Sequence, residues 1–79
     1  MPSSRDKIYA TIADVLEVDV SILTDDSGPE ELEQWDSLSH ISLVAAIEKE
    51  FSLSVPPDVA IDFDTVGDVV VWVEGKLDG

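Results

Sequence analysis

Two residues in the stretch from Gln34 to Leu43 have side chains suited to chemistry, Ser37 and His40. They lie roughly one helical turn apart, so a serine nucleophile with a histidine base is the first hypothesis to weigh. Such a base must also be oriented by a third group and paired with an oxyanion hole, and no sequence feature predicts either. His40 also falls on the helical stripe of Leu43 and Ile47. We therefore expect a half-buried packing histidine and no catalytic residue.

Ser37 stands where a loop becomes a helix, directly after Asp36. Serine and aspartate are common there for capping alone, because their side-chain oxygens accept hydrogen bonds from the first free backbone N–H groups. The same N–H groups and the helix dipole also favour an anion, so the Ser37 hydroxyl is suited to carry a phosphate ester. Spacing and composition leave both interpretations open.

Metal ligands are scarce in this chain. It has no cysteine and one histidine, which excludes disulfides and cysteine-based sites and leaves little for zinc. Asp62, Asp64 and Gly67 match the first, third and sixth positions of a calcium-binding EF-hand loop. Val66 and Val73 occupy its fifth and twelfth positions, where oxygen ligands are needed. We predict no metal site.

Acidic side chains dominate the composition, with 18 Asp and Glu against 4 Lys and Arg and a net charge of −14. Such a surface repels phosphate backbones, so we expect no nucleic-acid partner. It also steers the protein toward basic patches on other proteins. The hydrophobic content of 44% in 79 residues is enough for one small core, so we predict a single domain over residues 1–79 and a monomer.

Nothing in the sequence predicts an association with membranes. No apolar run approaches the ~20 residues that span a bilayer. The first residues lack the basic-then-apolar pattern of a signal peptide, and Lys and Arg are too few for a helix that lies on anionic lipid. We expect a cytoplasmic protein without membrane insertion.

Apolar residues at helical spacing predict a first helix, capped by Ser3 or Ser4 and ending near Glu17, with Ile8 and Ile12 on its inner face.

Residues 18–35 then form a long loop, because Thr24 to Pro29 is a dense turn signal. We expect the apolar residues of this loop to tuck under the helices, with Leu32 and Trp35 as its anchors.

A second helix is predicted over residues 37–51, with two different faces. The inward stripe is formed by Leu43, Ala46, Ile47 and Phe51. The other face is less polar than solubility requires, which favours a partner-binding surface; besides Ser37, we assign to it Leu38, Ile41, Ala45 and Glu48.

Two prolines at 56 and 57 end this region, since proline removes a backbone donor and restricts the residue before it. Asp58 is then predicted to cap one short turn over residues 59–62. Asp64 or Thr65 caps a last helix, in which the predicted inward residues are Val66, Val69, Val70, Val73 and Leu77, with Trp72 at the boundary. The expected fold is all-α, a small four-helix bundle with three main helices, a short third helix and a long first loop.

At this point the residues resemble a known family. Asp36-Ser37-Leu38, the following helix that ends in Ile47-Glu48-x-Glu50-Phe51, and Thr65-Val66-Gly67-Asp68 before the last helix are similar to the acyl carrier protein family. The resemblance extends over nearly the whole chain.

The resemblance implies a non-catalytic carrier. Ser37 would hold a covalent phosphopantetheine arm, donated by coenzyme A through a separate phosphopantetheinyl transferase, and the arm's thiol would hold an acyl or aminoacyl group as a thioester. Asp36 would lie near the transferase's magnesium ion. Leu38, Ile41 and Ala45 would meet the enzymes that load and accept the cargo. The non-covalent alternative is an acidic helical adaptor that binds a basic partner through the second helix.

The chain also departs from the carriers of bulk fatty-acid synthesis. They usually place acidic residues along the exposed side of the second helix, where this chain has Ser39, Ser42 and Lys49. The departures favour a specialised pathway, such as polyketide synthesis, amino-acid loading or cell-surface modification.

Overall fold

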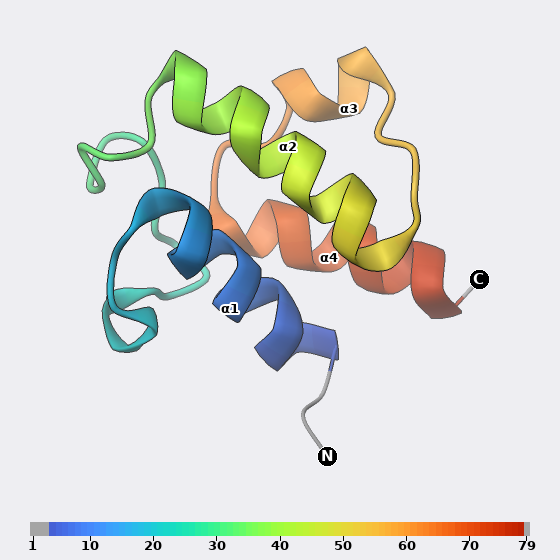
Figure 1. Cartoon of the computed structure of the whole chain (residues 1–79), viewed down its shortest axis with the longest axis horizontal. Helices are drawn as coiled ribbons and strands as arrows, with labels where there is room; N and C mark the ends of the chain where they lie inside the picture. The colour runs from blue at the N-terminus through green and yellow to red at the C-terminus, as the bar shows by residue number, and fades with distance from the viewer. Residues whose placement is uncertain (1–3, 79) are drawn as a thin grey trace.

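The fold is described from a computed structural model of residues 4–78, and all of its main elements are helices. No strand occurs among these residues. Along the chain the elements are α1 (Ser4–Leu16), the 3-10 turn η1 (Val20–Ile22), α2 (Ser37–Phe51), α3 (Pro57–Ile61) and α4 (Val66–Asp78). Figure 1 shows α1, α2 and α4 as the three main helices, with the short α3 above α4 and beside α2. The predicted all-α bundle is confirmed.

Helix α1 is the element that the other two long helices pack against. Its buried residues are spaced for a single face and comprise Ile8, Ile12, Ala13 and Leu16. The helix ends one residue before the predicted Glu17, which adopts a left-handed conformation with φ 57°. Of the two predicted caps, Ser3 lies outside the described residues and Ser4 is already helical.

Helix α2 begins and ends with defined caps. Asp36 is the N-cap and its side chain accepts a hydrogen bond from the backbone N–H of Ser39 at 2.9 Å. Ser52 adopts the left-handed conformation that commonly ends a helix, with φ 54°. Leu43 and Ile47 are fully buried, whereas Phe51 at the end of the predicted stripe is half-buried.

The long loop is anchored at three points, since Leu23, Leu32 and Trp35 are buried in the core. The expectation that all its apolar residues tuck under the helices is wrong for Val20 and Ile22, which are exposed in η1. Both residues lie in the 3-10 turn η1, none of whose residues is buried.

The same loop also caps helix α4. The backbone N–H groups of Val66 and Gly67 donate to the carbonyl oxygens of Ser27 at 2.8 Å and Asp25 at 2.9 Å. The sequence predicted Asp64 or Thr65 as the cap of α4. The structure shows Thr65 in this role, because its hydroxyl accepts a hydrogen bond from the backbone N–H of Asp68 at 3.2 Å. The loop is therefore tied to the start of α4 by backbone hydrogen bonds as well as by apolar packing.

Two details of the C-terminal region differ from the prediction. Helix α3 begins at Pro57 rather than after Asp58, because proline needs no backbone donor in the first turn and its φ is already helical. Leu77 is exposed rather than inward, since the last turn of α4 runs past the end of the core.

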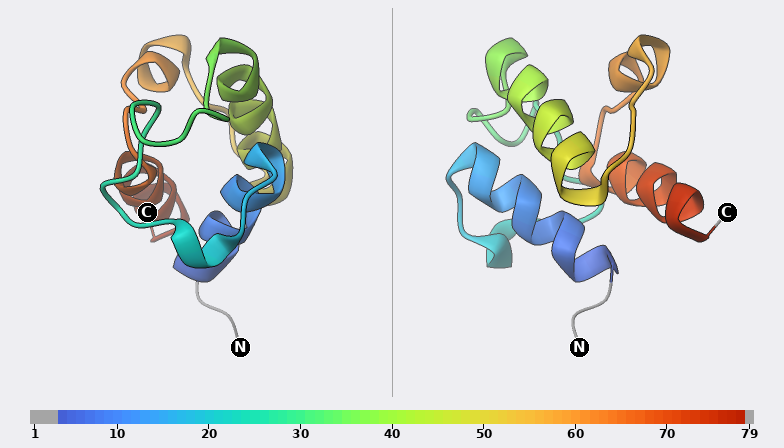
Figure 2. Two further views of the ribbon diagram at one scale, coloured as in Figure 1. Left: turned by 90° about the vertical axis from the view of Figure 1, so that its left-hand side faces the viewer. Right: turned by 45° about the vertical axis from the view of Figure 1, so that its right-hand side comes forward.

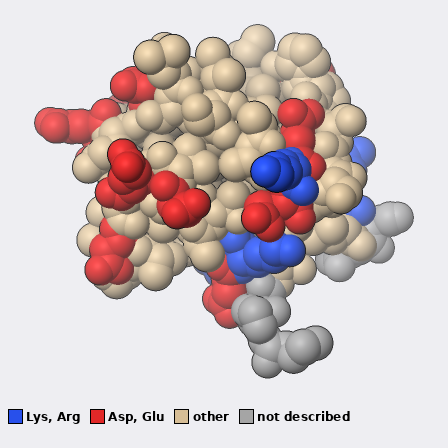
Figure 3. Space-filling model, in the orientation of Figure 1, with Lys and Arg blue, Asp and Glu red and all other residues tan. Residues whose placement is uncertain are grey.

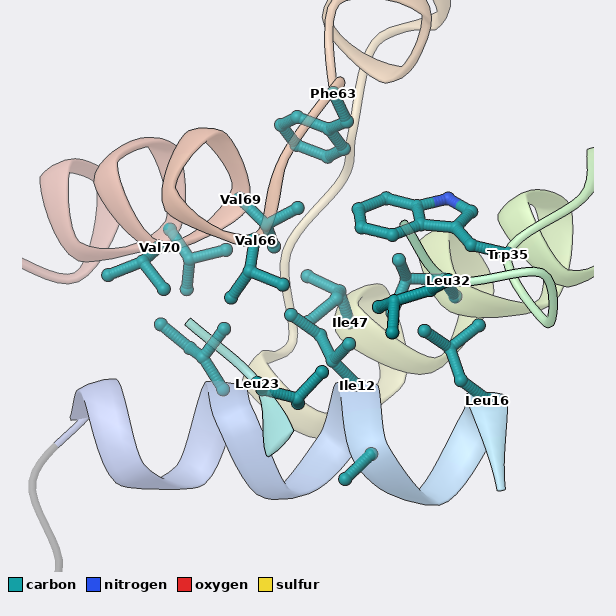
Figure 4. Close-up of a cluster of buried hydrophobic side chains, with 14 of the residues drawn as sticks. Ile12, Leu16, Leu23, Leu32, Trp35, Ile47, Phe63, Val66, Val69 and Val70 are labelled. Carbon is teal, nitrogen blue, oxygen red and sulfur yellow. The ribbon is translucent and has the colours of Figure 1, made fainter. Parts of the chain in front are cut away.

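The core lies between α1, α2 and α4 and is closed at one end by Trp35 and Phe63 (Figure 4). Both side chains are buried, as predicted for Trp35. Phe63 also meets the ring of Trp72 edge-on, with 6.0 Å between ring centroids. Trp72 is half-buried at the predicted boundary of α4.

Candidate functional site

Ser37 is the first residue of α2, directly after the N-cap, and it is exposed. The neighbouring Asp36 carboxylate accepts the N–H of Ser39, and this backbone hydrogen bond lowers the pKa of Asp36 below its ordinary value. Asp36 is therefore ionised at neutral pH. An exposed hydroxyl thus stands beside a fixed carboxylate at the positive end of a helix.

His40 does not serve Ser37 as a base, because both of its ring nitrogens are occupied elsewhere. The indole N–H of Trp35 donates to His40 Nδ1 at 3.0 Å. His40 Nε2 lies 2.7 Å from the carbonyl oxygen of Ala60. A carbonyl only accepts, so Nε2 carries the proton and the ring is the neutral Nε2–H tautomer. His40 is half-buried and stacked on Trp35, which confirms the packing role and removes the proposed serine–histidine pair.

A groove of about 600 Å³ lies beside Ser37. It is lined by the end of the long loop, the start of α2, Ile61 of α3 and the connection from α3 to α4. Trp35 and Phe63 form its inner wall, and Asp36 and Asp64 lie at its edge. We call this feature the Ser37 groove.

Apolar side chains around the groove reach into solvent. Leu38 is 77% exposed and Ile41 is 67% exposed, and Ala45 is exposed on the next turn of the same helix. Ile61 of α3, 77% exposed, adds to this surface and was missed by sequence reasoning. Its only signal was an aliphatic residue in a turn too short to show a helical period. We call Leu38, Ile41, Ala45 and Ile61 the apolar rim.

The sequence assigned Glu48 to the same partner-binding face, but its side chain contacts the connection between α2 and α3 and is not part of the apolar rim. It is half-buried, and its Oε2 accepts a hydrogen bond from the backbone N–H of Val55 at 2.8 Å. Its carboxylate thus holds the connection between α2 and α3.

Charges are distributed unevenly over the molecule. Figure 3 shows Lys and Arg on the lower and right-hand parts of one face, whereas the charged side chains visible on the left-hand side, near the start of α2, are all Asp or Glu. Three basic side chains have partners within the chain: Arg5 donates to Asp25, Lys7 lies 3.8 Å from Glu50, and the Lys76 Nζ lies over the ring of Trp72.

Within residues 4–78, no group of three or more His, Asp or Glu side chains is arranged to hold a metal ion. Among the same residues, no helix has both the length and the apolar character needed to cross a bilayer.

Comparisons with known proteins agree with this geometry. Residues 6–73 match the family described as "Phosphopantetheine attachment site". The chain is 37% identical over 70 residues to an acyl carrier protein of Rickettsia canadensis, covering 89% of this chain and 81% of the relative. It belongs to the acyl carrier protein family.

Two further comparisons cover almost the full length. An acyl carrier protein of Porphyromonas gingivalis is 32% identical over 77 residues, which is 98% of this chain and 99% of that protein. The solution structure of the holo acyl carrier protein from Geobacter metallireducens superimposes with a TM-score of 0.84 at 27% identity, covering 99% of this chain and 88% of that one.

Membership in the family makes the chain a carrier that uses a covalent phosphopantetheine group. The residues present fit such a group. A phosphate ester needs an exposed hydroxyl, and the first turn of α2 offers one where backbone N–H groups and the helix dipole favour negative charge. When bound, the group would supply a thiol that forms thioesters; the chain itself offers the exposed hydroxyl, the Ser37 groove and the apolar rim.

Proposed function

We propose that Ser37 is the attachment point of the phosphopantetheine arm. The observation that carries this proposal is its position: an exposed hydroxyl on the first residue of α2, at the mouth of the Ser37 groove. In the attachment step, Ser37 Oγ forms a bond to the phosphorus of coenzyme A's pantetheine phosphate. The pyrophosphate bond breaks, the nucleotide part leaves, and the hydroxyl proton passes to a base of the separate phosphopantetheinyl transferase.

Asp36 has a second role under this proposal. Its ionised carboxylate lies next to the reacting hydroxyl and caps α2 at the same time. It therefore holds the helix start rigid and presents negative charge toward the transferase's magnesium ion.

The loaded carrier delivers an acyl or aminoacyl thioester to partner enzymes that recognise the apolar rim. Attachment to an arm raises the effective concentration of the cargo at each partner's active site. Basic docking patches on these enzymes meet the acidic residues around the start of α2, as opposite charges accelerate encounter. The carrier acts in this proposal as a single-domain cytoplasmic monomer.

The composition of α2 supports a specialised pathway rather than bulk fatty-acid synthesis. Its residues from Ser37 to Ile47 include no Asp, Glu, Lys or Arg, and the carboxylate of Glu48, the first acidic residue, binds the backbone N–H of Val55. Partners of this carrier therefore recognise α2 itself by apolar contact.

Mass spectrometry tests the attachment. The purified apo protein is incubated with coenzyme A and a broad-specificity phosphopantetheinyl transferase, and we expect a mass gain of one phosphopantetheinyl group. Ser37→Ala abolishes the gain, whereas Ser42→Ala, an exposed serine of the same helix, retains it. A gain that persists in Ser37→Ala would refute the assignment.

A further inference from the structure

The Ser37 groove combines apolar walls with a negatively charged edge. Its walls are aromatic and aliphatic, and its edge carries the carboxylates of Asp36 and Asp64. No Lys or Arg is among the described residues that line it. The arm attached to Ser37 starts at the mouth of this groove, so the cargo at its far end reaches the groove when the arm folds back along the surface.

Among residues 4–78, no Lys or Arg forms an ion pair with the carboxylates at this edge. Asp36 is held ionised by the N–H of Ser39. Asp64 is exposed, and in the described part of the chain only its backbone N–H is engaged, by Asp68. Arg5 is engaged by Asp25 on another part of the molecule. A cation brought by a ligand would therefore find both carboxylates available.

We propose that the Ser37 groove favours cargo that ends in an ammonium group on a short apolar stem, as in an aminoacyl thioester, and disfavours cargo that ends in a carboxylate. The inference rests on the proposed attachment at Ser37 and names the class of cargo for that site. The apolar stem gains by leaving water against Ile41 and Ile61. The terminal charge then meets the carboxylates, attractively for ammonium and repulsively for carboxylate.

The size of this preference follows from the exposure of the carboxylates. An ion pair at a protein surface contributes little, because water and salt screen it, so each terminal charge changes groove occupancy by about two- to fivefold. The difference in groove occupancy between ammonium and carboxylate cargo should shrink when added salt makes the screening length shorter than the separation of the charges.

Three cargoes that share a two-methylene stem test the proposal. The protein is loaded with amide-linked phosphopantetheine analogues that end in β-alanyl, butyryl or succinyl groups, which differ only in an ammonium, methyl or carboxylate terminus. Mass spectrometry first verifies loading. Nuclear Overhauser contacts between cargo methylenes and the side chains of Trp35 and Ile61 then report occupancy. We expect the contacts to weaken in the order β-alanyl, butyryl, succinyl.

A pair of matched variants identifies the carboxylate. Asp64→Asn should remove about half or more of the β-alanyl preference. Asp62→Asn makes the same charge change two residues away, on a side chain that lines the neighbouring depression between α3 and α4, and should leave the preference intact. Equal contacts for all three cargoes, or stronger contacts for succinyl, would overturn the inference while leaving attachment at Ser37 standing. Absence of loading would instead refute the attachment itself.

Discussion

The indole N–H of Trp35 donates to Nδ1 of His40 at 3.0 Å and joins the end of the long loop to the start of α2. The other ring nitrogen of His40 binds the carbonyl of Ala60 in α3. One imidazole therefore connects three segments that surround the Ser37 groove. Figure 2 shows that α3 stands away from α1, and the hydrogen bond between His40 and Ala60 ties α3 to α2.

His40→Ala should destabilise the fold by about 1–3 kcal/mol, because it leaves the buried Trp35 N–H without its partner and removes the side-chain hydrogen bond to the Ala60 carbonyl, which then keeps only backbone N–H donors. Urea unfolding followed by circular dichroism measures the change. Ser42→Ala, on an exposed position of the same helix, should stay within about 0.5 kcal/mol. Mass gain on Ser37 should survive in His40→Ala; its loss in a folded variant would return His40 to a role in chemistry.

Three glycines provide a test of the packing between the loop and α4. A Cβ on Gly28 would lie 2.4 Å from the carbonyl oxygen of Asp64, and one on Gly67 would lie 2.9 Å from that of Asp25. Because these are backbone atoms, Gly28→Ala should cost about 1–3 kcal/mol. Gly67→Ala should cost less, since alanine favours the helix by about 1 kcal/mol.

Gly75 is the matched control, because nothing lies within 4 Å of an added Cβ there. Gly75→Ala should raise stability by about 0.5–1 kcal/mol through helix propensity alone. Thermal unfolding of the three variants measures the order of their stabilities. Destabilisation by Gly75→Ala, or a neutral Gly28→Ala, would contradict the described contacts.

Periodicity and capping signals predicted much of this fold. The inner faces of α1 and α2, the Asp36 cap and the buried Trp35 follow from local patterns that the tertiary structure preserves. The prediction that Leu77 faces inward was wrong, because a stripe of apolar residues along a helix does not show where the core ends.

The site was less predictable than the fold. Ser37 and the apolar residues after it are visible along one helix, but the groove is made from segments that meet only in three dimensions. The packing role of His40 was predicted, but its partners were not: the ring bonds to Trp35 and Ala60, which lie 5 and 20 positions away. Ile61 joined the surface for the same reason: α3 is positioned by tertiary contacts rather than by a sequence period.

Acid should destabilise the protein through a few specific carboxylates. Hydrogen bonds from the Arg5 guanidinium and the Tyr9 hydroxyl lower the pKa of Asp25, and the N–H of Ser39 lowers that of Asp36. A lowered pKa in the folded state means that the stabilisation is present above the ordinary carboxylate pKa of about 4 and is lost as the pH falls through the folded values.

The net charge of −14 has the opposite effect at higher pH, because protonating other carboxylates relieves repulsion. The melting temperature should therefore rise slightly from pH 7 toward about 5 and fall below about 4. Asp25→Asn should flatten the acid limb, while Asp26→Asn, its exposed neighbour, should leave the limb in place. An acid limb unchanged in Asp25→Asn would show that this cluster does not contribute.

The proposed docking role of the apolar rim can be tested against other exposed aliphatic residues of the chain. Leu38 on α2 and Val71 on α4 are 77% and 73% exposed, so a charge at either position disturbs the fold little. Leu38 adjoins Ser37, whereas Val71 lies on a different helix. Leu38→Asp should lower kcat/KM for phosphopantetheinyl transfer to Ser37 at least tenfold, because it places an unpaired charge in an apolar contact.

Val71→Asp should change the same kcat/KM by less than about twofold, as expected for a surface charge far from the contact. If both variants lose activity equally, net charge rather than the rim governs recognition. The acidic-adaptor hypothesis makes a separate prediction: a basic partner would bind Ser37→Ala as well as the natural chain and would be released by salt. For a carrier that docks through the apolar rim, the loss of kcat/KM caused by Leu38→Asp should persist at raised salt, and its Ser37→Ala variant transfers no cargo.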